Sequence, residues 1–496
     1  MFIGIDFGTS FSQSATVYNG SPLVLLGPAE YGIPSEFYYD SENGIQVGQD
    51  ALDIAQGVNV GNLVSEIKMH LMEREPRTLD GRDFRNTEIM RHLFKKIVSC
   101  AVGIANSRLI DSEIQGAVLA TPVSFGMQEK DQIQEAAKTC TSSPMKIMAI
   151  IKEPVAAAIS YYKDALEDNK CILVFDLGGG TCDVALVKSD RRMRELFTVL
   201  DADMERIGGR DWDKAVTDYV VKQVLCKTGI DIKDEPRYME AVKREVQKAK
   251  VRLSSPDTNV SKVRICMDGG RMVTITIGLG LFDEITQDLL EQSMQCLMRL
   301  YQRALADGYS IHEIICVGGS SNMLQVKRRI EELFPGYRIR VYQPAHAVVN
   351  GLAWYAKMIG DQPQPIPIPD IAGLSYGVLA YQRGSNTEKC IVNIIKMGQP
   401  VPATCEHPFR PHELGQSEVA FEVYESRNTE DTYAITEQMT KVGTLRFSPP
   451  RDYTEQYGMI CFLTLKNDGY LYCKVIDDNG KYVPARFQLD KGIRAD

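Results

Sequence analysis

The hydrophobic pattern of the chain changes character near residue 360. Before that point, apolar runs typical of strands alternate with long stretches whose apolar residues recur at the spacing of amphipathic helices. After it come short segments with period-two alternation, such as residues 418–424 and 470–475, which turn sequences such as Asp478-Asn479-Gly480 separate. The pattern predicts an α/β part followed by an all-β part, and we expect the second to be a β-sandwich.

A proline-rich segment separates the two parts. Between Pro363 and Pro369 every second residue is proline, which is typical of an extended linker and incompatible with a helix. We therefore predict an α/β domain at residues 1–360, a linker at 361–370 and a β-sandwich domain at 371–496.

The α/β part carries one local pattern twice. An apolar run at residues 2–5 ends in Asp6, and another at 172–175 ends in Asp176. Each is followed by a glycine-containing turn with a threonine and then by a second alternating strand. This repetition predicts two β-hairpins in two lobes of similar fold that face a cleft. The lobes are expected at about residues 1–165 and 166–360.

Both glycine turns contain residue types that suit a nucleotide phosphate. Glycine lets the backbone approach an anion closely, consecutive amides form an anion-binding concavity, and a hydroxyl can donate to a phosphate oxygen. The aspartate at the end of each strand can hold Mg²⁺ directly or through water. One such turn alone is more often ordinary turn chemistry, but two in matching positions favour a phosphate clamp. The turn residues are Gly8, Thr9 and Ser10, and Gly178, Gly179, Gly180 and Thr181.

A third glycine turn, Gly318-Gly319-Ser320, follows the apolar run at residues 314–317. A nucleoside could lie against the backbone of this turn. The alternative is a plain turn between a strand and a helix, and the turn by itself does not separate the two interpretations.

Composition and charge narrow the classes of function. With 44% apolar and 24% charged residues the chain is ordinary for a soluble globular protein, and its net charge of −9 offers no basic field to nucleic acid or an anionic membrane. No run approaches the roughly 20 apolar residues that span a bilayer. The 12 cysteines form no C-x-x-C pair and no cluster with histidine, which favours free thiols in a reducing cytoplasm over zinc sites or disulfides.

Further segments complete an ordered series of motifs. They are Ile33-Pro34-Ser35, Ala120-Thr121-Pro122-Val123, and residues 151–158 and 207–213 before the linker, and residues 374–378, 423–427, 442–447 and 465–471 after it. In this order and at these spacings, the motifs resemble the 70-kDa heat-shock chaperone family. The resemblance covers residues 1 to about 360 and continues into the expected β-sandwich.

The resemblance implies a two-lobed, actin-like ATPase domain with ATP or ADP, Mg²⁺ and K⁺ at the bottom of the cleft. Asp6 and Asp176 match the carboxylates that hold the water shell of the metal, and both glycine turns match the family's phosphate turns. Lys68 falls at the catalytic lysine and Glu153 at the acidic residue near the metal. Without the family, Lys68 would be interpreted as an ordinary exposed lysine and Glu153 as a charge beside a helix-opening proline. The implied catalytic residues are Asp6, Lys68, Glu153, Asp176 and Thr181.

The nucleoside contacts are implied by the same resemblance. In the helical segment 245–254, positions 247, 250, 251 and 254 share one face, which matches the family's ribose and adenine contacts. A solvated, lysine-rich face is the alternative. Asn322 and Ala345 stand where the family has arginine and aspartate, so we expect a looser base pocket. The implied nucleotide contacts are Gly208, Gly209, Gln247, Lys250, Val251, Ser254, Gly318, Gly319 and Ser320.

In the expected β-sandwich, Val378, Tyr381, Val419 and Phe421 match positions that line the family's peptide-binding pocket. Alternating apolar residues on a strand usually fill the core, which is the alternative. The resemblance implies as partners unfolded or extended polypeptide segments, a J-domain co-chaperone and a nucleotide-exchange factor. The chain stops at Asp496, where the sandwich should end, so we expect no helical lid.

The leading hypothesis is a cytoplasmic, ATP-dependent chaperone or chaperone-like ATPase that binds exposed apolar peptide segments and hydrolyses Mg²⁺–ATP slowly. One alternative is a nucleotide-gated adaptor or scaffold that binds a single dedicated protein. Another is an actin-like sugar kinase, although the C-terminal β-sandwich counts against it. Because the linker prolines lack N–H donors on one edge, we expect weakened coupling between the two domains.

Overall fold

The computed structural model describes the chain apart from residues 26–31, 58–59, 74, 124, 166–169, 190–196, 362–369, 383–384, 386, 438, 467–469 and 487–496. The chain divides into two units. The first unit comprises Met1–Val123, Gln132–Arg192 and Asp203–Ile366, and the second comprises Ser124–Asp131, Met193–Ala202 and Pro367–Asp496. The alternating prolines of the predicted linker lie outside the described residues.

The first sheet of the first unit contains the first predicted hairpin. Its strands follow the order β11-β10-β1-β2-β3; β1 and β2 are antiparallel, whereas β10 runs parallel to β1 and β11 parallel to β10. β1 and β10 are buried at nearly every position, which explains their unbroken apolar runs. The strands are β1 (Phe2–Phe7), β2 (Phe11–Tyr18), β3 (Ser21–Val24), β10 (Gly116–Thr121) and β11 (Ile147–Lys152), with β4 (Ile33–Pro34) paired to β2.

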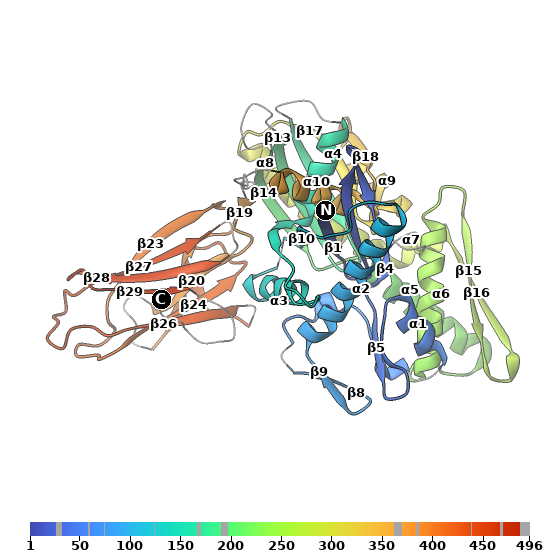
Figure 1. Ribbon diagram of the computed structural model, residues 1–496, viewed down its shortest axis with the longest axis horizontal. Coiled ribbons are helices and arrows are strands. Elements are labelled where there is room, and N and C mark those ends of the chain that lie inside the picture. Colours follow the sequence, from blue (N-terminus) through green and yellow to red (C-terminus); the bar gives the residue numbers. More distant parts are fainter. Residues whose placement is uncertain are drawn as a thin grey trace. The chain divides into compact units, whose positions relative to one another are not determined.

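The second sheet contains the second predicted hairpin and has the same strand connections as the first. Figure 1 labels its strands β13, β14, β17 and β18. Its order is β14-β13-β12-β17-β18; β12 and β13 are antiparallel, and β17 and β18 continue the sheet in parallel. Both predicted hairpins are therefore present, while the lobe boundary near residue 165 stays a prediction. The strands are β12 (Cys171–Leu177), β13 (Cys182–Ser189), β14 (Phe197–Glu205), β17 (Ile311–Val317) and β18 (Arg338–Val341).

Two helices connect the sheets by close packing. α4 (Glu153–Ala165) contacts β12 and β13, α10 (Ala347–Gly360) contacts β1 and β2, and the two helices contact each other. A Cβ atom on Gly351 would lie only 1.7 Å from the carbonyl oxygen of Ala156. A larger residue at this position would force the helices apart, at a cost of about 1–3 kcal/mol or more. The glycine therefore allows the close approach that joins the two halves of the unit.

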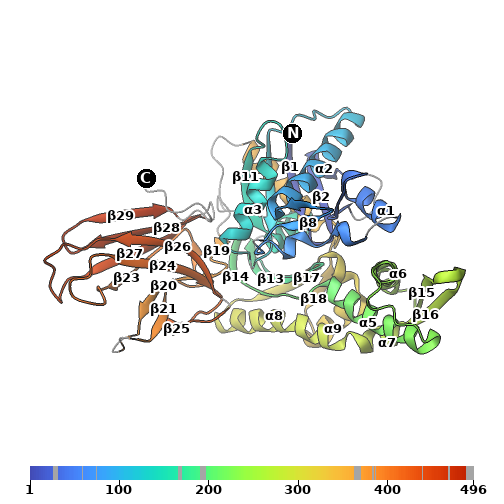
Figure 2. The same ribbon diagram turned by 90° about the horizontal axis from the view of Figure 1, so that it is seen from below.

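The second sheet is also covered by α8 (Gln287–Ala306) and α9 (Leu324–Leu333). α8 packs against β12 and β13, and α9 packs against β18. Figure 2 shows both helices running along this sheet.

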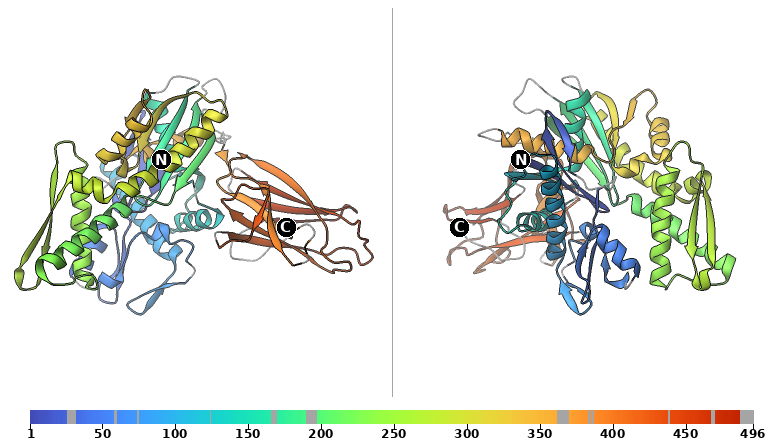
Figure 3. Two further views of the ribbon diagram at one scale, coloured as in Figure 1. Left: turned by 180° about the vertical axis from the view of Figure 1, so that it is seen from behind. Right: turned by 45° about the vertical axis from the view of Figure 1, so that its right-hand side comes forward.

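α5 (Gly209–Thr228) and α6 (Pro236–Leu253) pack together, and α6 also packs on the hairpin of β15 (Val260–Cys266) and β16 (Met272–Gly278). Strand β15 alternates exposed and buried residues, as expected for a strand with one solvated face. Figure 3 shows the yellow-green hairpin lying along α6. Pro236 opens α6, and Gly229, with a φ of 72°, closes α5 in the left-handed region.

The remaining elements before residue 323 are the long helix α2 and several shorter strands, helices and 3₁₀ turns. They are β5 (Phe37–Asp40), β6 (Gly44–Val47), β7 (Leu63–Val64), β8 (Arg77–Leu79), β9 (Arg82–Phe84), α1 (Gln49–Gly57), α2 (Asn86–Ser107), α3 (Met127–Lys138), α7 (Leu279–Ile285), and the 3₁₀ turns η1 (Val60–Asn62), η2 (Ile67–Met69), η3 (Asp268–Gly270) and η4 (Gly319–Asn322).

The C-terminal part of the second unit, from residue 370 onward, is built from antiparallel strands. One sheet has the order β25-β21-β20-β24-β26 and another β23-β27-β28-β29, and residues of both contribute to one hydrophobic core. The strands predicted at 418–424 and 470–475 are β24 and β28. The strands are β19 (Asp370–Ile371), β20 (Ser375–Tyr381), β21 (Lys389–Ile395), β22 (Pro400–Val401), β23 (Ala403–Phe409), β24 (Val419–Ser426), β25 (Thr432–Ala434), β26 (Thr440–Phe447), β27 (Met459–Leu465), β28 (Leu471–Asp477) and β29 (Tyr482–Arg486).

None of the helices in the described part of the chain combines the length and the apolar composition that a membrane crossing requires. All the cysteines lie in described residues, and each is a free thiol.

Candidate functional site

A cavity of about 500 Å³ in the first unit brings together most of the residues predicted for nucleotide binding and catalysis. Of those residues, Gly180 and Gly208 do not line it. The predicted residues that do are Asp6, Gly8, Thr9, Ser10, Lys68, Glu153, Asp176, Gly178, Gly179, Thr181, Gly209, Gln247, Lys250, Val251, Ser254, Gly318, Gly319 and Ser320.

The two hairpin turns meet directly, although they lie far apart in the sequence. A Cβ atom on Gly179 would lie 2.7 Å from the Ser10 hydroxyl oxygen, and one on Gly180 would lie 3.2 Å from the Thr9 hydroxyl oxygen. The glycines of the second turn thus make room for the side chains of the first. Gly180, although it does not line the cavity, is part of this contact.

Two further glycine segments lie against the second turn. The N–H of Gly209 donates to the carbonyl oxygen of Gly178 at 3.0 Å, and the Ser320 hydroxyl donates to the same oxygen at 2.9 Å. A Cβ atom on Gly208 would lie 2.5 Å from the backbone of Gly179 and Gly180, so only glycine fits there. Backbone from three separate segments therefore surrounds one end of the cavity.

Lys68 is buried, with 3% of its surface exposed, so its interpretation as an ordinary exposed lysine is wrong. It lies in η2, where its Nζ atom is 2.6 Å from Oε1 of Glu153, the first residue of α4. Burial acts to lower the pKa of the Lys68 ammonium, but the carboxylates of Glu153 and Asp6 outweigh it and hold that pKa above its usual value. Lys68 therefore stays protonated and presents a cation to the cavity.

Carboxylates gather around this lysine in excess of its charge. Burial, and then the charge of Glu153, raise the pKa of Asp6 to about 7. Burial and the neighbouring carboxylates Glu153, Asp183 and Asp6 raise the pKa of Asp176 well above its usual value. The mutual repulsion of these groups is the electrostatic environment that a divalent cation relieves.

Asp183 belongs to this group, although sequence reasoning did not assign it to the site. It lies opposite Asp176 in the β12–β13 register, and its Oδ1 accepts the N–H of Val123 at 2.8 Å. Burial, and then the charge of Glu153, raise the pKa of Asp183 to about 7. Its position directly after Thr181-Cys182 on the second hairpin was the available signal.

Within the described residues, no three histidine, cysteine, aspartate or glutamate side chains lie close enough together to hold a metal ion directly. Mg²⁺ keeps several waters when proteins bind it, so two carboxylates that act through its water shell suffice. Asp6 and Asp176, at the ends of β1 and β12, suit that arrangement.

α6 and the third glycine turn also line the cavity. The predicted face of α6, Gln247, Lys250, Val251 and Ser254, lines the cavity. The Lys250 ammonium donates to the carbonyl oxygen of Gly209 at 2.7 Å and to Asp213 Oδ2 at 2.6 Å, which ties α6 to α5. Sequence reasoning missed Asp213, because nothing local links it to a lysine on the next helix.

The positions at which the chain departs from the pattern of the resembled family differ in their placement. Ala345 lines the cavity, whereas the Asn322 side chain is exposed and donates to the carbonyl oxygen of Gly319 at 3.2 Å. Val251 is 46% exposed, so an apolar surface is available to a base. The looser base pocket expected from these residues stays a prediction.

The residues predicted for peptide binding are divided between core and surface. Val378 and Phe421 are buried in the core of the second unit, and Val419 packs against that core. Tyr381 is 39% exposed and stacks on His412 with ring centroids 3.6 Å apart. The structure thus gives Val378 and Phe421 the core role that strand alternation predicts, and their contact with a peptide stays a prediction.

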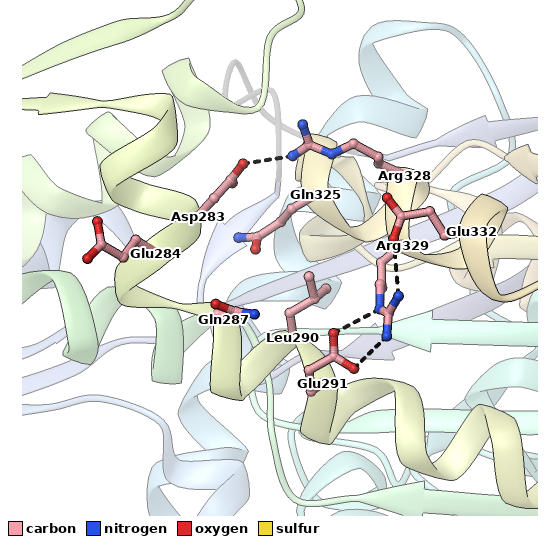
Figure 4. Close-up of a pocket in the computed structure, with 9 residues that line it drawn as sticks. All are labelled: Asp283, Glu284, Gln287, Leu290, Glu291, Gln325, Arg328, Arg329 and Glu332. Atoms are coloured by element: carbon pink, nitrogen blue, oxygen red, sulfur yellow. Dashed lines mark hydrogen bonds and ion pairs between the residues drawn. The ribbon is translucent and has the colours of Figure 1, made fainter.

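A second cavity, of about 410 Å³, lies among α7, α8 and α9 and differs in chemistry (Figure 4). Its two arginines are already paired: Arg328 with Asp283 at 2.7 Å, and Arg329 with Glu291 at 2.8 Å and Glu332 at 3.1 Å. None of the predicted glycine turns lines it. Because its carboxylates outnumber its arginines, it does not suit a phosphate.

A comparison with models of known protein families matches residues 75–441 to the family described as Hsp70 protein. Members of that family bind ATP and ADP with Mg²⁺, hydrolyse ATP, and act as chaperones on unfolded polypeptides together with co-chaperones. The match includes the second glycine turn, α6 and the third glycine turn, together with strands of the second unit. Since it covers well over half of the chain, the protein belongs to the Hsp70 family.

Proposed function

We propose that this protein is an ATP-dependent chaperone or chaperone-like ATPase. It binds Mg²⁺–ATP in the first cavity, hydrolyses it slowly, and binds short exposed apolar segments of other polypeptides through its second unit. The observation that carries the proposal is the convergence of two equivalent hairpin turns on one cavity that also contains the buried Lys68–Glu153 ion pair.

The main-chain amides of the two turns receive the phosphates, and the hydroxyls of Thr9, Ser10 and Thr181 donate to phosphate oxygens. Asp6 and Asp176 are the residues that would hold Mg²⁺, which when bound would offset negative charge on the phosphates. Burial of these groups strengthens every charge interaction, since the effective dielectric constant in the cavity is below that of water.

Lys68 stabilises the negative charge that develops on the terminal phosphoryl group. Its ammonium is fixed by Glu153, so little reorganisation is needed at the moment of reaction.

The nucleoside lies toward α6. Gln247 accepts from a ribose hydroxyl, Val251 provides apolar contact to the base, and the backbone at Gly318 and Gly319 allows the base to approach closely. K⁺ beside the phosphates and cytoplasmic location remain expectations from the resemblance.

Peptide binding is assigned to the second unit, with an extended segment held by main-chain hydrogen bonds and one side chain in a pocket. Exposed Tyr381 on β20 supports a contact of this kind. A J-domain co-chaperone and a nucleotide-exchange factor are the partners that family membership suggests.

The adaptor hypothesis remains the second candidate. The burial of Val378 and Phe421 favours it, because a core that is already filled leaves fewer side chains for a general apolar pocket.

An array of unrelated heptamers tests the proposal. The full chain, with ADP and with ATP, is applied to peptides that differ in apolar content. A chaperone binds many of the apolar heptamers and few of the polar ones, whereas failure to bind the apolar set would contradict the chaperone proposal and leave the adaptor.

A further inference from the structure

Arg210 lies at the start of α5, directly beside the second phosphate turn. Its N–H donates to the carbonyl oxygen of Gly179 at 3.0 Å, and its side chain lines the first cavity. Neither the glycine pattern nor the resemblance assigned it a role. Its backbone is fixed against the phosphate turn, while its long side chain can change direction.

The guanidinium of Arg210 pairs with a carboxylate from a distant segment of the chain. Its Nη1 lies 3.0 Å from Oε2 of Glu66, which precedes Lys68 by two residues and adopts a left-handed conformation with a φ of 57°. The Arg210 side chain is 26% exposed and that of Glu66 is 38% exposed. An ion pair so accessible to water is weak and readily exchanged.

Two of the other cations that line the cavity have partners of their own. Lys68 pairs with buried Glu153, and Lys250 is held by Asp213. These contacts are more buried than the Arg210–Glu66 pair. Arg210 is therefore a cation that can move to an arriving phosphate without leaving a buried carboxylate unpaired.

We propose that Arg210 contacts the terminal phosphate of a nucleoside triphosphate, and that Glu66 takes the guanidinium back when that phosphate is absent. A terminal phosphate carries more negative charge than one carboxylate and accepts the planar guanidinium in bidentate fashion, so it displaces Glu66. A nucleoside diphosphate leaves the ion pair closed over the cavity. Arg210 thus discriminates triphosphate from diphosphate. This inference rests on the proposed nucleotide function.

The test is calorimetric titration of the full chain, in Mg²⁺, with ADP and with the non-hydrolysable β,γ-imido analogue of ATP. Arg210→Ala should weaken binding of the analogue by about tenfold to a hundredfold, the range that one hydrogen bond to a charged group gives, and leave ADP within about twofold. Arg210→Lys keeps the positive charge but loses the bidentate guanidinium, so its affinity for the analogue should lie between those of the unchanged chain and Arg210→Ala. Glu66→Gln removes the competitor and should tighten analogue binding by about two- to fivefold.

Arg328 also forms an ion pair, with Asp283, but lies outside the first cavity. Arg328→Ala therefore serves as the control and should change the affinity for neither ADP nor the analogue. Equal weakening of ADP and the analogue by Arg210→Ala, or no change in either, would overturn the inference while the proposed function stands. If the unchanged chain bound neither nucleotide, the proposed function would fail and this inference with it.

Discussion

The two hairpins β1–β2 and β12–β13 have the same pairing and end in the same kind of turn, but their glycines have different tasks. A Cβ atom on Gly8 would lie 2.1 Å from the carbonyl oxygen of Phe11, so the first glycine is required by the shape of its own turn. Gly179 and Gly180 instead make room for Ser10 and Thr9. The first turn contributes side chains, and the second contributes open backbone that receives them. A duplicated motif has thus become two complementary halves of one site.

Chemistry is also divided unequally between the halves. The cation comes from the part of the chain before the second hairpin. Lys68 lies about a hundred residues ahead of that hairpin in the sequence and pairs with Glu153 at the start of α4. The second hairpin supplies Asp176 and Asp183, opposite each other in register. Changes that affect each half separately can therefore test the assigned roles.

The largest effect is expected from Lys68→Ala. Turnover should fall by roughly a hundredfold or more, the scale observed when one preorganised charge is removed, because Lys68 is the buried cation that Glu153 holds in place in the cavity. ATP affinity should stay within about tenfold, since the turns and the metal supply most of it. Single-turnover hydrolysis and a nucleotide titration measure the two quantities, and exposed Lys138→Ala is the control. Normal turnover in Lys68→Ala would refute the catalytic assignment.

The second-largest effect is expected from a side chain at position 208, next to the second turn. In Gly208→Ala the new methyl group meets the backbone of Gly179 and Gly180 at 2.5 Å, and backbone cannot yield as a side-chain end can. We expect a loss of about 1–3 kcal/mol in the free energy of unfolding, and weaker ATP binding because the phosphate turn shifts. Thermal melts and titrations measure both. The control is Gly103→Ala, in α2 with open space around it, which should be neutral or slightly stabilising. If Gly208→Ala also left stability and ATP binding unchanged, the close approach of Gly208 to Gly179 and Gly180 would have no consequence.

Asp6→Asn and Asp176→Asn compare the two halves directly. Each keeps the size of the side chain but removes a negative charge, so each should reduce by about tenfold the tightening of ATP binding that Mg²⁺ produces. Titration of ATP with and without Mg²⁺ measures it. An unchanged Mg²⁺ effect in both variants would mean that these aspartates are structural turn residues.

The smallest expected effect is that of pH on stability and on Mg²⁺-dependent ATP binding. With a pKa of about 7 in the folded chain, against an ordinary value near 3.8, Asp6 and Asp183 are largely protonated at pH 6 and ionised at pH 8. The folded state then binds more protons than the unfolded one between about pH 4 and 7, so their contribution to stability falls as pH rises through that range and levels off above it. Mg²⁺ needs the ionised forms, so the Mg²⁺-dependent tightening of ATP binding should grow by several-fold from pH 6 to pH 8.

Asp6→Asn provides the internal control for this pH dependence, because ATP itself takes up a proton in the same range. The variant should show a shallower rise than the unchanged chain. Identical pH profiles for the two would assign the whole effect to the nucleotide.

The sequence predicted what is local and missed what depends on distant segments. Strand, turn and helix patterns are short-range, so both hairpins, α6 and the third glycine turn could be predicted from them. Lys68 lies in a short 3₁₀ turn with no periodicity, and only the resemblance identified it. Asp183, Asp213 and Arg210 owe their place to segments far along the chain, and no local pattern marks such contacts.

The peptide residues illustrate a different limit. The resemblance singled out Val378, Tyr381, Val419 and Phe421, but an inward position on a strand can serve either a core or a pocket. In the structure, Val378 and Phe421 are buried in the core. The sequence could not predict this, because the pattern of apolar residues is the same for a core strand and for a strand that lines a pocket.

Calorimetric titration of the unmodified full chain with ATP, in the presence and in the absence of Mg²⁺, tests most directly whether the two turns form one nucleotide site. We predict a single site per chain that binds ATP and that Mg²⁺ tightens, because both turns and both aspartates converge on one cavity. No binding of ATP, or binding of the same strength with and without Mg²⁺, would contradict this conclusion.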